Sequence, residues 1–379
     1  MKKILALCLT IAMATMLFTG CAGTTVVIGE CTCPCVTEDA APAATEATTD
    51  ASAEAAVPET LPAYEETPAA DGAVKTGLAV STNISESASA TADAAGVAKY
   101  DVTLAAVTVD DNGVIQSCVI DSIPASVNFD ATGAITTDLA TAIATKNEQG
   151  ENYGMVAWGG AIAEWDAQVK AVADYAVGKT VDELKNGDID MTTGKAKDGS
   201  DLSSSATIYL AGYVYAIEAA VNNAQHLGAN AGDELVLTTM NKISSSTPAT
   251  AEAAGNAQLD ADIAVLTTKD GKITSCYIDS LQAKVAFDTT GTITTDLTAA
   301  VQTKNALGEN YGMVAWGGAI AEWDAQVAAF ASYITGKTAD EVAGIAIDEG
   351  TKPADGTDLK TSVTIAIGGF QALIAKAMQ

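Results

Sequence analysis

The stretch ENYGMVAWGGAIAEWDAQV occurs twice in this chain without a change, at Glu151–Val169 and again at Glu309–Val327. A run of this length with two tryptophans, a methionine and several glycines does not arise from biased composition. It indicates an internal repeat, and a repeat has to be recognised first because it decides the architecture.

The similarity between the two copies extends well beyond the identical run. Upstream, IQSCVIDS matches ITSCYIDS, and downstream DLSSSATI at Asp201–Ile208 matches DLKTSVTI at Asp358–Ile365. Each copy is about 150 residues long, an ordinary length for one domain. We therefore expect two modules of one fold, at 74–230 and 231–379.

The N-terminus carries the features of a bacterial lipoprotein signal. Lys2 and Lys3 precede an apolar run of about 15 residues, shorter than the roughly 20 that span a bilayer, and small residues lead to Cys21. This order resembles the site at which lipoproteins are cleaved and diacylated. We expect 1–20 to be a signal peptide and Cys21 to carry lipid, so that the chain is extracytoplasmic and anchored to the outer face of the cell membrane. Ordinary secretion without lipid is the alternative.

Residues 21–73 are predicted to be a tether. Between Val36 and Gly72 the chain consists mainly of Ala, Thr, Glu, Asp and Pro. This composition offers too little apolar surface for a core, and its acidic groups repel one another, which predicts a disordered spacer. A lipid-anchored acidic tether of this kind would hold the modules away from the membrane surface.

The charge of the chain narrows the choice of partner. There are 48 acidic and 19 basic residues, a formal net charge of −29, and no arginine. Nucleic acid and anionic membrane surfaces require cationic side chains that neutralise phosphate, so this composition argues against both. A small-molecule ligand, a cationic partner or a redox partner at the cell surface remains, and the membrane is expected to be contacted through the lipid on Cys21.

The cysteines of the mature chain other than Cys21 fall into two groups. Cys118 and Cys276 occupy equivalent places in strand-like runs, which predicts small buried side chains rather than nucleophiles. The segment ECTCPC carries Cys31, Cys33 and Cys35 within the expected tether. Structural zinc usually requires CxxC-type spacing and a fourth ligand. A disulfide with one leftover thiol, a redox role and a metal role therefore stay open, and no metal site is assigned.

Each module begins with the pattern of β-strands. Val102–Val109 is followed by Asp111-Asn112-Gly113 and a second apolar run, Val114–Ile120. An Asn-Gly or Asp-Gly pair between such runs is a strong hairpin signal. With the run near Leu78 and a short strand at Ser126–Asp130, each module is expected to hold an antiparallel sheet of about four strands.

The pattern then changes to that of helices. A stretch capped by Thr137 or Asp138 comes first, a helix ended by Gly178 follows, and a last helix is predicted at Tyr213–Ala224 and Phe370–Met378. Strands followed by helices make each module α+β, a small antiparallel sheet with helices packed on one side. The residues expected on one face of the second helix are Ile162, Trp165, Val169, Val172 and Ala176.

The modules contain few residues that could act as a catalytic acid or base. His226 is the only histidine and lies in the connector between the modules, which removes Ser-His-Asp and Cys-His catalysis from both. Glu164 and Asp166, with Glu322 and Asp324 as their counterparts, lie in the identical run, but residues two apart on a helix point in different directions. They are predicted to be a solvated flank around a buried Trp165, and no catalytic residue is assigned.

The segment YGMVAWGG is a better candidate for a binding site. Its aromatic, methionine and glycine residues, just before a helix, can form a flat apolar slot for a planar ligand, and its glycine N–H groups suit an anion such as phosphate. A packed loop that seals the sheet against the helix is the alternative. The candidate side chains are Tyr153, Met155 and Trp158 in the first module and Tyr311, Met313 and Trp316 in the second.

A second motif carries a resemblance to a known family. DLSSSAT, at Asp201–Thr207, resembles the Asp-x-x-Ser-Gly-Ala-Thr signature of the FMN-binding domain family, which is found in flavin-carrying extracytoplasmic electron-transfer proteins, including lipoproteins of Firmicutes. The hairpin VTVDDNGVIQSCVIDS is also similar to the sheet of that family. In the family the threonine can be esterified to the FMN phosphate, which the resemblance places at Thr207 and Thr364. The neighbouring residues that it implies for the cofactor are Ser204, Ser205 and Ser362.

The motif departs from the family pattern, and two functions follow. Ser205 and Ser362 stand where the family has glycine, and 362–367 can also be read as a strand with Thr364 on its exposed face. The sequence predicts a surface lipoprotein whose two FMN-binding-like modules carry flavin for electron transfer, with FMN near Trp158 and Trp316. The alternative is a non-enzymatic binding or structural lipoprotein that recognises another small ligand or a cell-wall component.

Overall fold

The computed structural model describes residues 72–379. Contacts divide the chain into two units, Met1–Asp50 and Ala51–Gln379, and everything described below belongs to the second unit. The expected signal peptide and nearly all of the expected tether lie outside the described residues. So do the predictions made for Cys21, Cys31, Cys33 and Cys35.

Two three-stranded antiparallel sheets form the centre of the described unit. Their orders are β1-β2-β3 and β6-β7-β8. The turn predicted at Asp111-Asn112-Gly113 joins β2 to β3, and Asp270 and Gly271, both with positive φ, join β7 to β8 as a two-residue hairpin turn. The strands are β1 (Lys75–Asn83), β2 (Gly96–Val109), β3 (Ile115–Phe129), β6 (Glu234–Lys242), β7 (Gly255–Lys269) and β8 (Lys272–Phe287).

Each of these sheets has three strands rather than the expected four or so. The two short strands predicted at Val114–Ile120 and Ser126–Asp130 are one continuous strand, β3, in which Pro124 pairs with Asp101. Proline has no N–H to donate, but β3 lies at the edge of its sheet, where a missing donor is tolerated. The strand therefore continues through the proline.

Helices follow the strands in each half, so the fold combines antiparallel sheets with helices, as the predicted α+β class requires. After β3 come α1 (Lys146–Gln149), α2 (Met155–Gly159), α3 (Trp165–Ala176), α4 (Val181–Asn186), the small hairpin β4 (Ile189–Asp190) and β5 (Lys195–Ala196), and α5 (Ala211–Asn222). After β8 come α6 (Lys304–Leu307), α7 (Met313–Gly317), α8 (Trp323–Ile334), α9 (Ala339–Ala343) and α10 (Gly368–Ala377).

The helix predictions are confirmed in part. α3 buries Trp165 and the apolar residues that follow on its face, but Ile162 precedes the helix and is 55% exposed. Glu164 is the N-cap residue with extended backbone (φ −65°, ψ 162°), so the helical period does not continue back to Ile162. The prediction of a helix after Thr137 or Asp138 is wrong. The chain there forms turns, and the short helix α1 begins only after Thr145, whose hydroxyl and Glu148 make a capping box.

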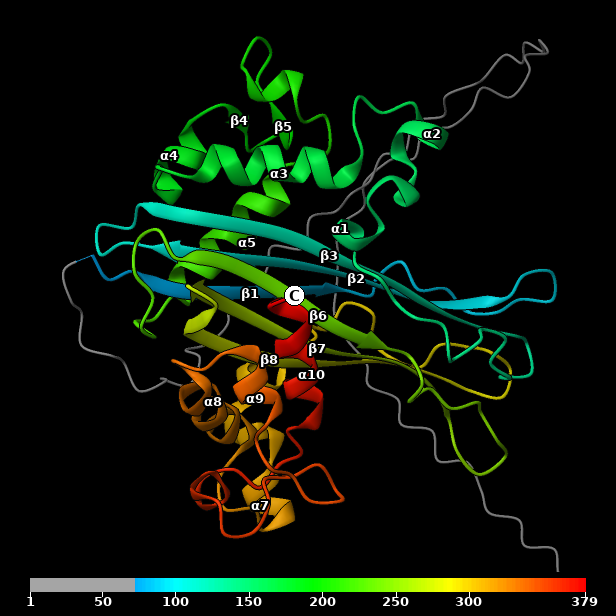
Figure 1. The fold of residues 1–379 in the computed structure, drawn as a ribbon. Helices are drawn as coiled ribbons and strands as arrows, with labels where there is room; N and C mark the ends of the chain where they lie inside the picture. Colours follow the sequence, from blue (N-terminus) through cyan, green and yellow to red (C-terminus); the bar gives the residue numbers. More distant parts are fainter. Residues whose placement is uncertain (1–71) are drawn as a thin grey trace, which may run out of the picture. The chain divides into compact units, whose positions relative to one another are not determined.

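The two sheets pack face to face, and each carries helices on its other face (Figure 1). Strand β2 shows how the sequence does this. Leu104 and Ala106 point into a core that also contains residues of β6–β8, whereas Ala105 and Val107 belong to a second core beneath α3 and α5. Because side chains alternate along a strand, one strand contributes to both cores.

Several direct contacts join the sheets. The rings of Phe129 and Phe287 stack with centroids 4.0 Å apart, and the buried Tyr100 hydroxyl donates to the Ala257 carbonyl at 2.8 Å. Ranges 74–230 and 231–379 thus share one apolar core, in which apolar burial is the main stabilising contribution.

A reciprocal pair of hydrogen bonds lies at the ends of the sheets. Ala90 N–H donates to the Gly291 carbonyl and Ala249 N–H to the Gly133 carbonyl, both at 2.8 Å. Gly133 has φ 71°, and a Cβ there would come within 2.6 Å of the Ala249 Cβ. Only glycine permits this approach.

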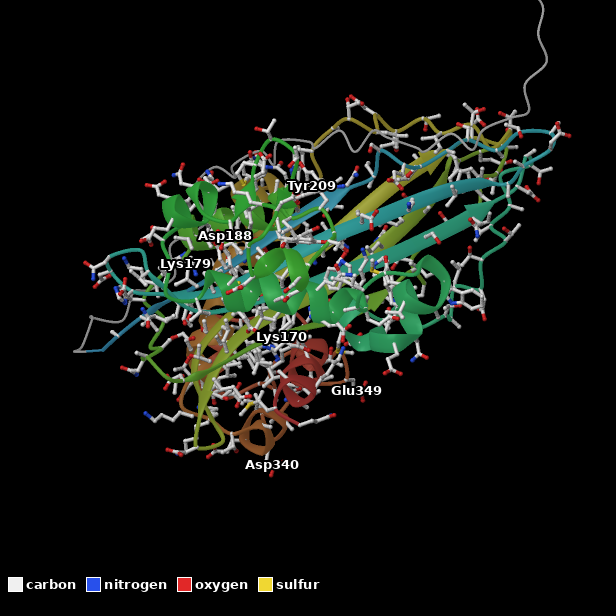
Figure 2. The ribbon with its side chains drawn as sticks, turned by 90° about the horizontal axis from the view of Figure 1, so that it is seen from above. Lys170, Lys179, Asp188, Tyr209, Asp340 and Glu349 are labelled. Atoms are coloured by element: carbon white, nitrogen blue, oxygen red, sulfur yellow. The ribbon has the colours of Figure 1, made fainter. Side chains whose placement is uncertain are left out.

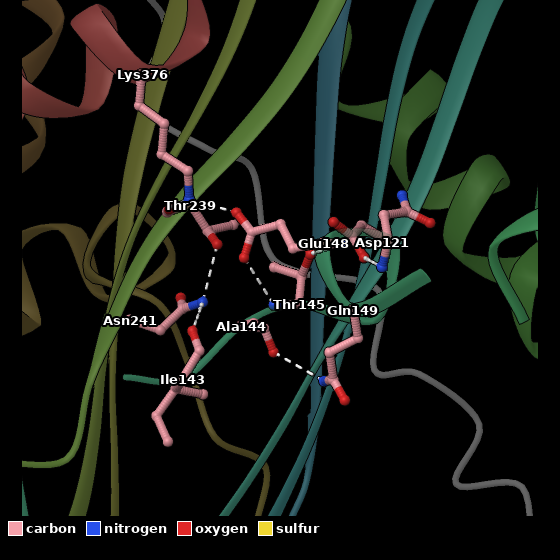
Figure 3. Close-up of polar contacts among 10 residues, drawn as sticks. Asp121, Ile143, Ala144, Thr145, Glu148, Gln149, Thr239, Asn241 and Lys376 are labelled. Carbon is pink, nitrogen blue, oxygen red and sulfur yellow. Dashed lines mark hydrogen bonds and ion pairs between the residues drawn. The ribbon is translucent and has the colours of Figure 1, made fainter. Parts of the chain in front are cut away.

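The C-terminal helix ties the halves together again (Figure 3). Lys376 Nζ, on α10, contacts the Glu148 carboxylate of α1 and donates to the Thr239 carbonyl of β6 at 2.6 Å. Asn241 Nδ2 donates to the Ile143 carbonyl at 3.1 Å. Loop and helix residues of one half are therefore positioned by a strand and a helix of the other.

The stacked phenylalanines predict a measurable coupling between the halves. In a double-mutant cycle, Phe129→Leu and Phe287→Leu should show a coupling free energy of about 1 kcal/mol beyond their separate effects. Denaturant unfolding followed by circular dichroism measures it. Phe129→Leu combined with Phe330→Leu is the control, because Phe330 packs in the opposite helical layer and the two changes should be additive. Additivity of the first pair would contradict the stacking contact.

Candidate functional site

The threonine of the FMN-like motif is tied to the identical run. In the first half the Thr207 N–H and hydroxyl both donate to Gln168 Oε1, at 2.8 and 3.2 Å, and Gln168 Nε2 donates to the Ala163 carbonyl at 2.8 Å. Gln168 is fully buried, so these bonds satisfy an amide that would otherwise be costly to bury. The second half repeats the arrangement with Thr364, Gln326 and Ala321.

The rest of the motif forms a tight turn rather than a strand. Residues Leu202–Ser204 and Asp358–Thr361 are single 3₁₀ turns, and 362–367 has no strand, so the alternative interpretation of SVTIAI as a strand is wrong. Ser204, Ser205 and Ser362 are exposed. The Ser204 hydroxyl donates to the Asp201 carbonyl and the Ser362 hydroxyl to the Leu359 carbonyl.

This turn does not fit a phosphate group in the arrangement observed. The backbone N–H groups from Ser203 to Ala206 donate to carbonyls of the same turn, and that of Thr207 donates to Gln168. A phosphate site of the family type requires backbone N–H groups that point at the ligand. Ser205 stands where the family pattern has glycine. It lies in this closed turn with a right-handed helical conformation (φ −113°, ψ −25°).

The most exposed large apolar side chains lie on the short helices α2 and α7. Trp158 is 90% exposed and Trp316 is 91% exposed, whereas Trp165 and Trp323, seven residues later, are 3% and 5% exposed. We call the exposed residues of each short helix and its following loop a tryptophan platform. The two platforms consist of Val156, Trp158 and Ile162, and of Val314, Trp316 and Ile320.

Each platform is fixed by the charge and backbone of its own run. The Glu164 carboxylate accepts hydrogen bonds from the Met155 and Val156 N–H groups, at 2.8 and 3.0 Å, and so caps the start of α2. Gly160, with φ 63°, ends the turn. Charge-assisted bonds of this kind are about twice as strong as neutral ones. Glu322 makes the same two bonds to Met313 and Val314.

A glycine holds the indole ring in place. Gly154 has φ 80°, and a Cβ there would lie 2.4 Å from Cδ1 and 2.8 Å from Nε1 of Trp158. The edge of the indole therefore rests on the glycine backbone. Gly312 and Trp316 have the same geometry. Almost all of the ring is open to solvent.

The other predicted members of the slot point elsewhere. Tyr153 and Met155 are half-buried and pack against the core beneath α3, and Lys146 Nζ lies 5.2 Å from the ring centroids of both Tyr153 and Trp165. These residues do not form one slot with Trp158, and they resemble the packed loop that was the alternative expectation. Tyr311, Met313 and Lys304 repeat the pattern in the second half.

Glu164 and Gln168 are the functional residues that the sequence pattern did not identify. Glu164 was expected to be a solvated flank, but its carboxylate is used by two backbone amides. Asp324, also expected to be solvated, is buried. The one signal in the sequence was their position: both Glu164 and Gln168 lie in the run that is identical in the two halves.

A buried carboxyl anchors the loop that precedes each platform. Asp279 Oδ1 accepts hydrogen bonds from the Ser280 and Asn305 N–H groups, at 2.7 and 3.1 Å. Burial raises the pKa of this carboxyl to about 7, against the lowering effect of a hydrogen bond from Thr303 and of the two backbone bonds. Asp121 has the same two backbone contacts in the first half, to Ser122 and Asn147, and burial raises its pKa as well.

The cysteines and the histidine have structural surroundings. Cys276 is buried as predicted and Cys118 is half-buried, and burial raises the pKa of both thiols. His226 Nε2 lies 3.0 Å from Asp111 Oδ1, which Lys75 also contacts. Within residues 72–379, no group of three or more His, Cys, Asp or Glu side chains is placed to hold a metal ion.

No protein-family model, curated protein or solved structure matches the chain. Among the described residues, no helix is both long and apolar enough to cross a bilayer. The interpretation of the site therefore depends on its geometry.

The buried Asp279 predicts a specific pH dependence. Because its pKa in the folded state is raised above the ordinary value of 3.8, the stability that the neutral carboxyl supports is present below about pH 4 and is lost as the pH rises to about 7. Asp279→Asn should flatten this fall in the free energy of unfolding by about 2 to 4 kcal/mol.

Urea unfolding between pH 4 and pH 7.5 measures this effect. Asp288→Asn is the matched control, because hydrogen bonds from Thr290 lower the pKa of Asp288 and its contribution is lost as the pH falls rather than as it rises. An unchanged pH profile for Asp279→Asn would contradict a neutral buried carboxyl.

Proposed function

We propose that this chain is a non-enzymatic binding lipoprotein in which two duplicated halves each present one tryptophan to an uncharged, sugar-like ring. Lipid on Cys21 would hold it at the outer face of the membrane, and the acidic segment 21–73 would extend it outward. The observation that carries the proposal is the near-complete exposure of Trp158 and Trp316 on turns held by identical contacts.

An exposed indole held against its own turn requires an explanation. Tryptophan is highly buried on average, and burying a large apolar side chain stabilises a fold by about 2 to 3 kcal/mol. Directly after the identical run the halves differ even at buried positions, where Val172 corresponds to Phe330. Retention of Trp158 and its neighbours at the surface therefore favours a role for them in contacting a partner.

The size of each platform favours a small ring over a protein surface. A stable protein interface buries about 800 Å² on each partner and involves about 20 to 30 residues, whereas a platform has three exposed apolar side chains. A single indole face suits a ligand with one flat apolar side. A pyranose ring is such a ligand, because its axial C–H groups pack on an aromatic face while its hydroxyls stay hydrated.

The charge of the chain argues against an anionic ligand. The net charge of −29 repels polyanions and anionic lipid surfaces. Figure 2 labels Lys170 and Lys179 on the helical layer. Both lysines are engaged by their own neighbours, because Lys170 pairs with Asp174 at 2.6 Å and Lys179 donates to the Tyr175 carbonyl. Neutral glycans of the cell wall are compatible with this charge and have a ring that suits an exposed indole.

The carboxylates near the platform support binding rather than turnover. Both oxygens of Glu164 accept backbone hydrogen bonds, and Asp121 is buried beneath a loop. A general acid or base has to reach the substrate with a free proton position. We therefore assign no catalytic role to either group.

Removal of the tryptophans tests the proposal. The chain without its expected signal peptide and lipid is titrated with the N-acetylglucosamine hexamer while its tryptophan fluorescence is recorded. Trp158→Ala and Trp316→Ala should each reduce the stoichiometry from two to one, and the double variant should lose at least tenfold in affinity. Glu164→Ala should weaken the first site alone, because it releases the turn.

Val177→Ala, which removes an exposed apolar side chain at the end of α3, is the control and should bind as the unmodified chain does. Undiminished binding of the hexamer by the double tryptophan variant would refute the proposal, as would binding to phosphatidylcholine vesicles but not to the hexamer.

FMN is the second candidate ligand. It is favoured by Thr207 and Thr364, which occupy equivalent positions and make the same contact to a buried glutamine in both halves, and it is opposed by the closed turn around them. In that case the chain would pass electrons at the cell surface to a redox partner.

The visible spectrum and intact mass decide this second candidate. The protein is produced in a host that supplies a flavin-transferring enzyme. A yellow protein heavier by one or two FMN, with the added mass lost in Thr207→Ala and Thr364→Ala, would establish the flavin carrier. We expect a colourless protein of unmodified mass, because no backbone N–H of the turn is free for phosphate.

A further inference from the structure

The two tryptophan platforms lie on opposite sides of the paired sheets. Figure 1 shows α2 on the side of α3 and α5, which contact β1–β3, and α7 on the side of α8 and α10, which contact β6–β8. Both sheets stand between them. With about 10 Å between packed sheets and about 10 Å for each helical layer, the platforms are separated by about 30 Å of folded protein.

This placement matters because each platform is small. One indole and two aliphatic side chains bind a single ring weakly, and a pair of sites on one face would allow one glycan strand to occupy both and gain avidity. A stiff strand cannot reach two sites on opposite sides of a rigid body, so it gains no avidity from the second site. They can instead be occupied by two strands at once.

The body between the platforms is rigid enough for this role. The sheets share an apolar core with the stacked Phe129 and Phe287, and Lys376 of α10 binds Glu148 of α1 across the boundary. The platforms are thus joined by packed protein and not by a flexible linker. Occupation of one does not bring the other nearer to the same strand.

We propose that one molecule cross-links two separate neutral glycan strands, one on Trp158 and one on Trp316. This inference rests on the proposed sugar-binding function and adds its mode of action. The chain acts as a bridge of fixed length between strands, and each half alone is sufficient for binding but not for bridging.

A bead assay separates bridging from binding. The N-acetylglucosamine hexamer is attached to red and to green beads, and the formation of mixed-colour clusters is measured as the chain without its signal peptide and lipid is added. The unmodified chain and Val177→Ala should form mixed clusters. Trp158→Ala and Trp316→Ala should each still coat both kinds of bead, with unchanged affinity for the free hexamer at the remaining site, but should form at least tenfold fewer clusters.

The outcomes distinguish the inference from the function on which it rests. Failure of the unmodified chain to bind the free hexamer would refute the sugar-binding function and the bridge together. Binding of two hexamers without clusters would refute the bridge alone. Clusters that persist in the single variants would also refute the bridge, because they would indicate self-association. A hundredfold loss of affinity for a long polymer in one single variant would refute it as well, because it would indicate that one strand spans both platforms.

Discussion

The packing of one sheet on the other is the interaction on which the rest of the structure depends. A three-stranded sheet with a helical layer on one side leaves its other face apolar, and that face has to be buried for the fold to be stable. Here Leu104 and Ala106 of β2 meet the corresponding face of β6–β8. The two helical layers are therefore pushed to the outside, which sets the positions of the short helices that carry Trp158 and Trp316.

The identical run performs two tasks that are linked in space. Its second half, around Trp165 and Gln168, belongs to the core and satisfies the turn that contains Thr207. Its first half displays Trp158, and Glu164 between them caps the displayed turn. A change in the buried part would thus move the exposed part, which gives a physical reason for the whole stretch to stay the same in both halves.

The sequence predicted much of the local structure, because local structure depends on period and turn chemistry. The hairpin turns, the strand-to-helix order and the last helix follow from alternation, Asn-Gly or Asp-Gly pairs and helical spacing. The continuous β3 was missed because tolerance of Pro124 depends on whether the strand lies at an edge. The helical face was extended too far, to Ile162, because the period does not show that Glu164 has an extended backbone and that its carboxylate accepts hydrogen bonds from Met155 and Val156.

The candidate site was less predictable for a similar reason. The helical period predicted the burial of Trp165, but the near-complete exposure of Trp158 in the same run could be seen only in the three-dimensional arrangement. The sequence also did not predict that the inner face of each sheet packs on the other sheet. A pattern of buried positions shows that a face is covered, but it does not show which element covers it. The threonine motif could be located, whereas the pairing of its N–H groups needed coordinates.

The reciprocal hydrogen bonds between Ala90 and Gly291 and between Ala249 and Gly133 have a consequence for how copies of this chain can associate. Each half presents to the other a surface of the kind found at two-fold symmetric dimer interfaces. The same contacts are satisfied when the first half of one copy packs on the second half of another. Exchange of halves between neighbouring copies therefore needs no new contact surface, and it would turn the proposed bridge within one molecule into a chain of linked molecules.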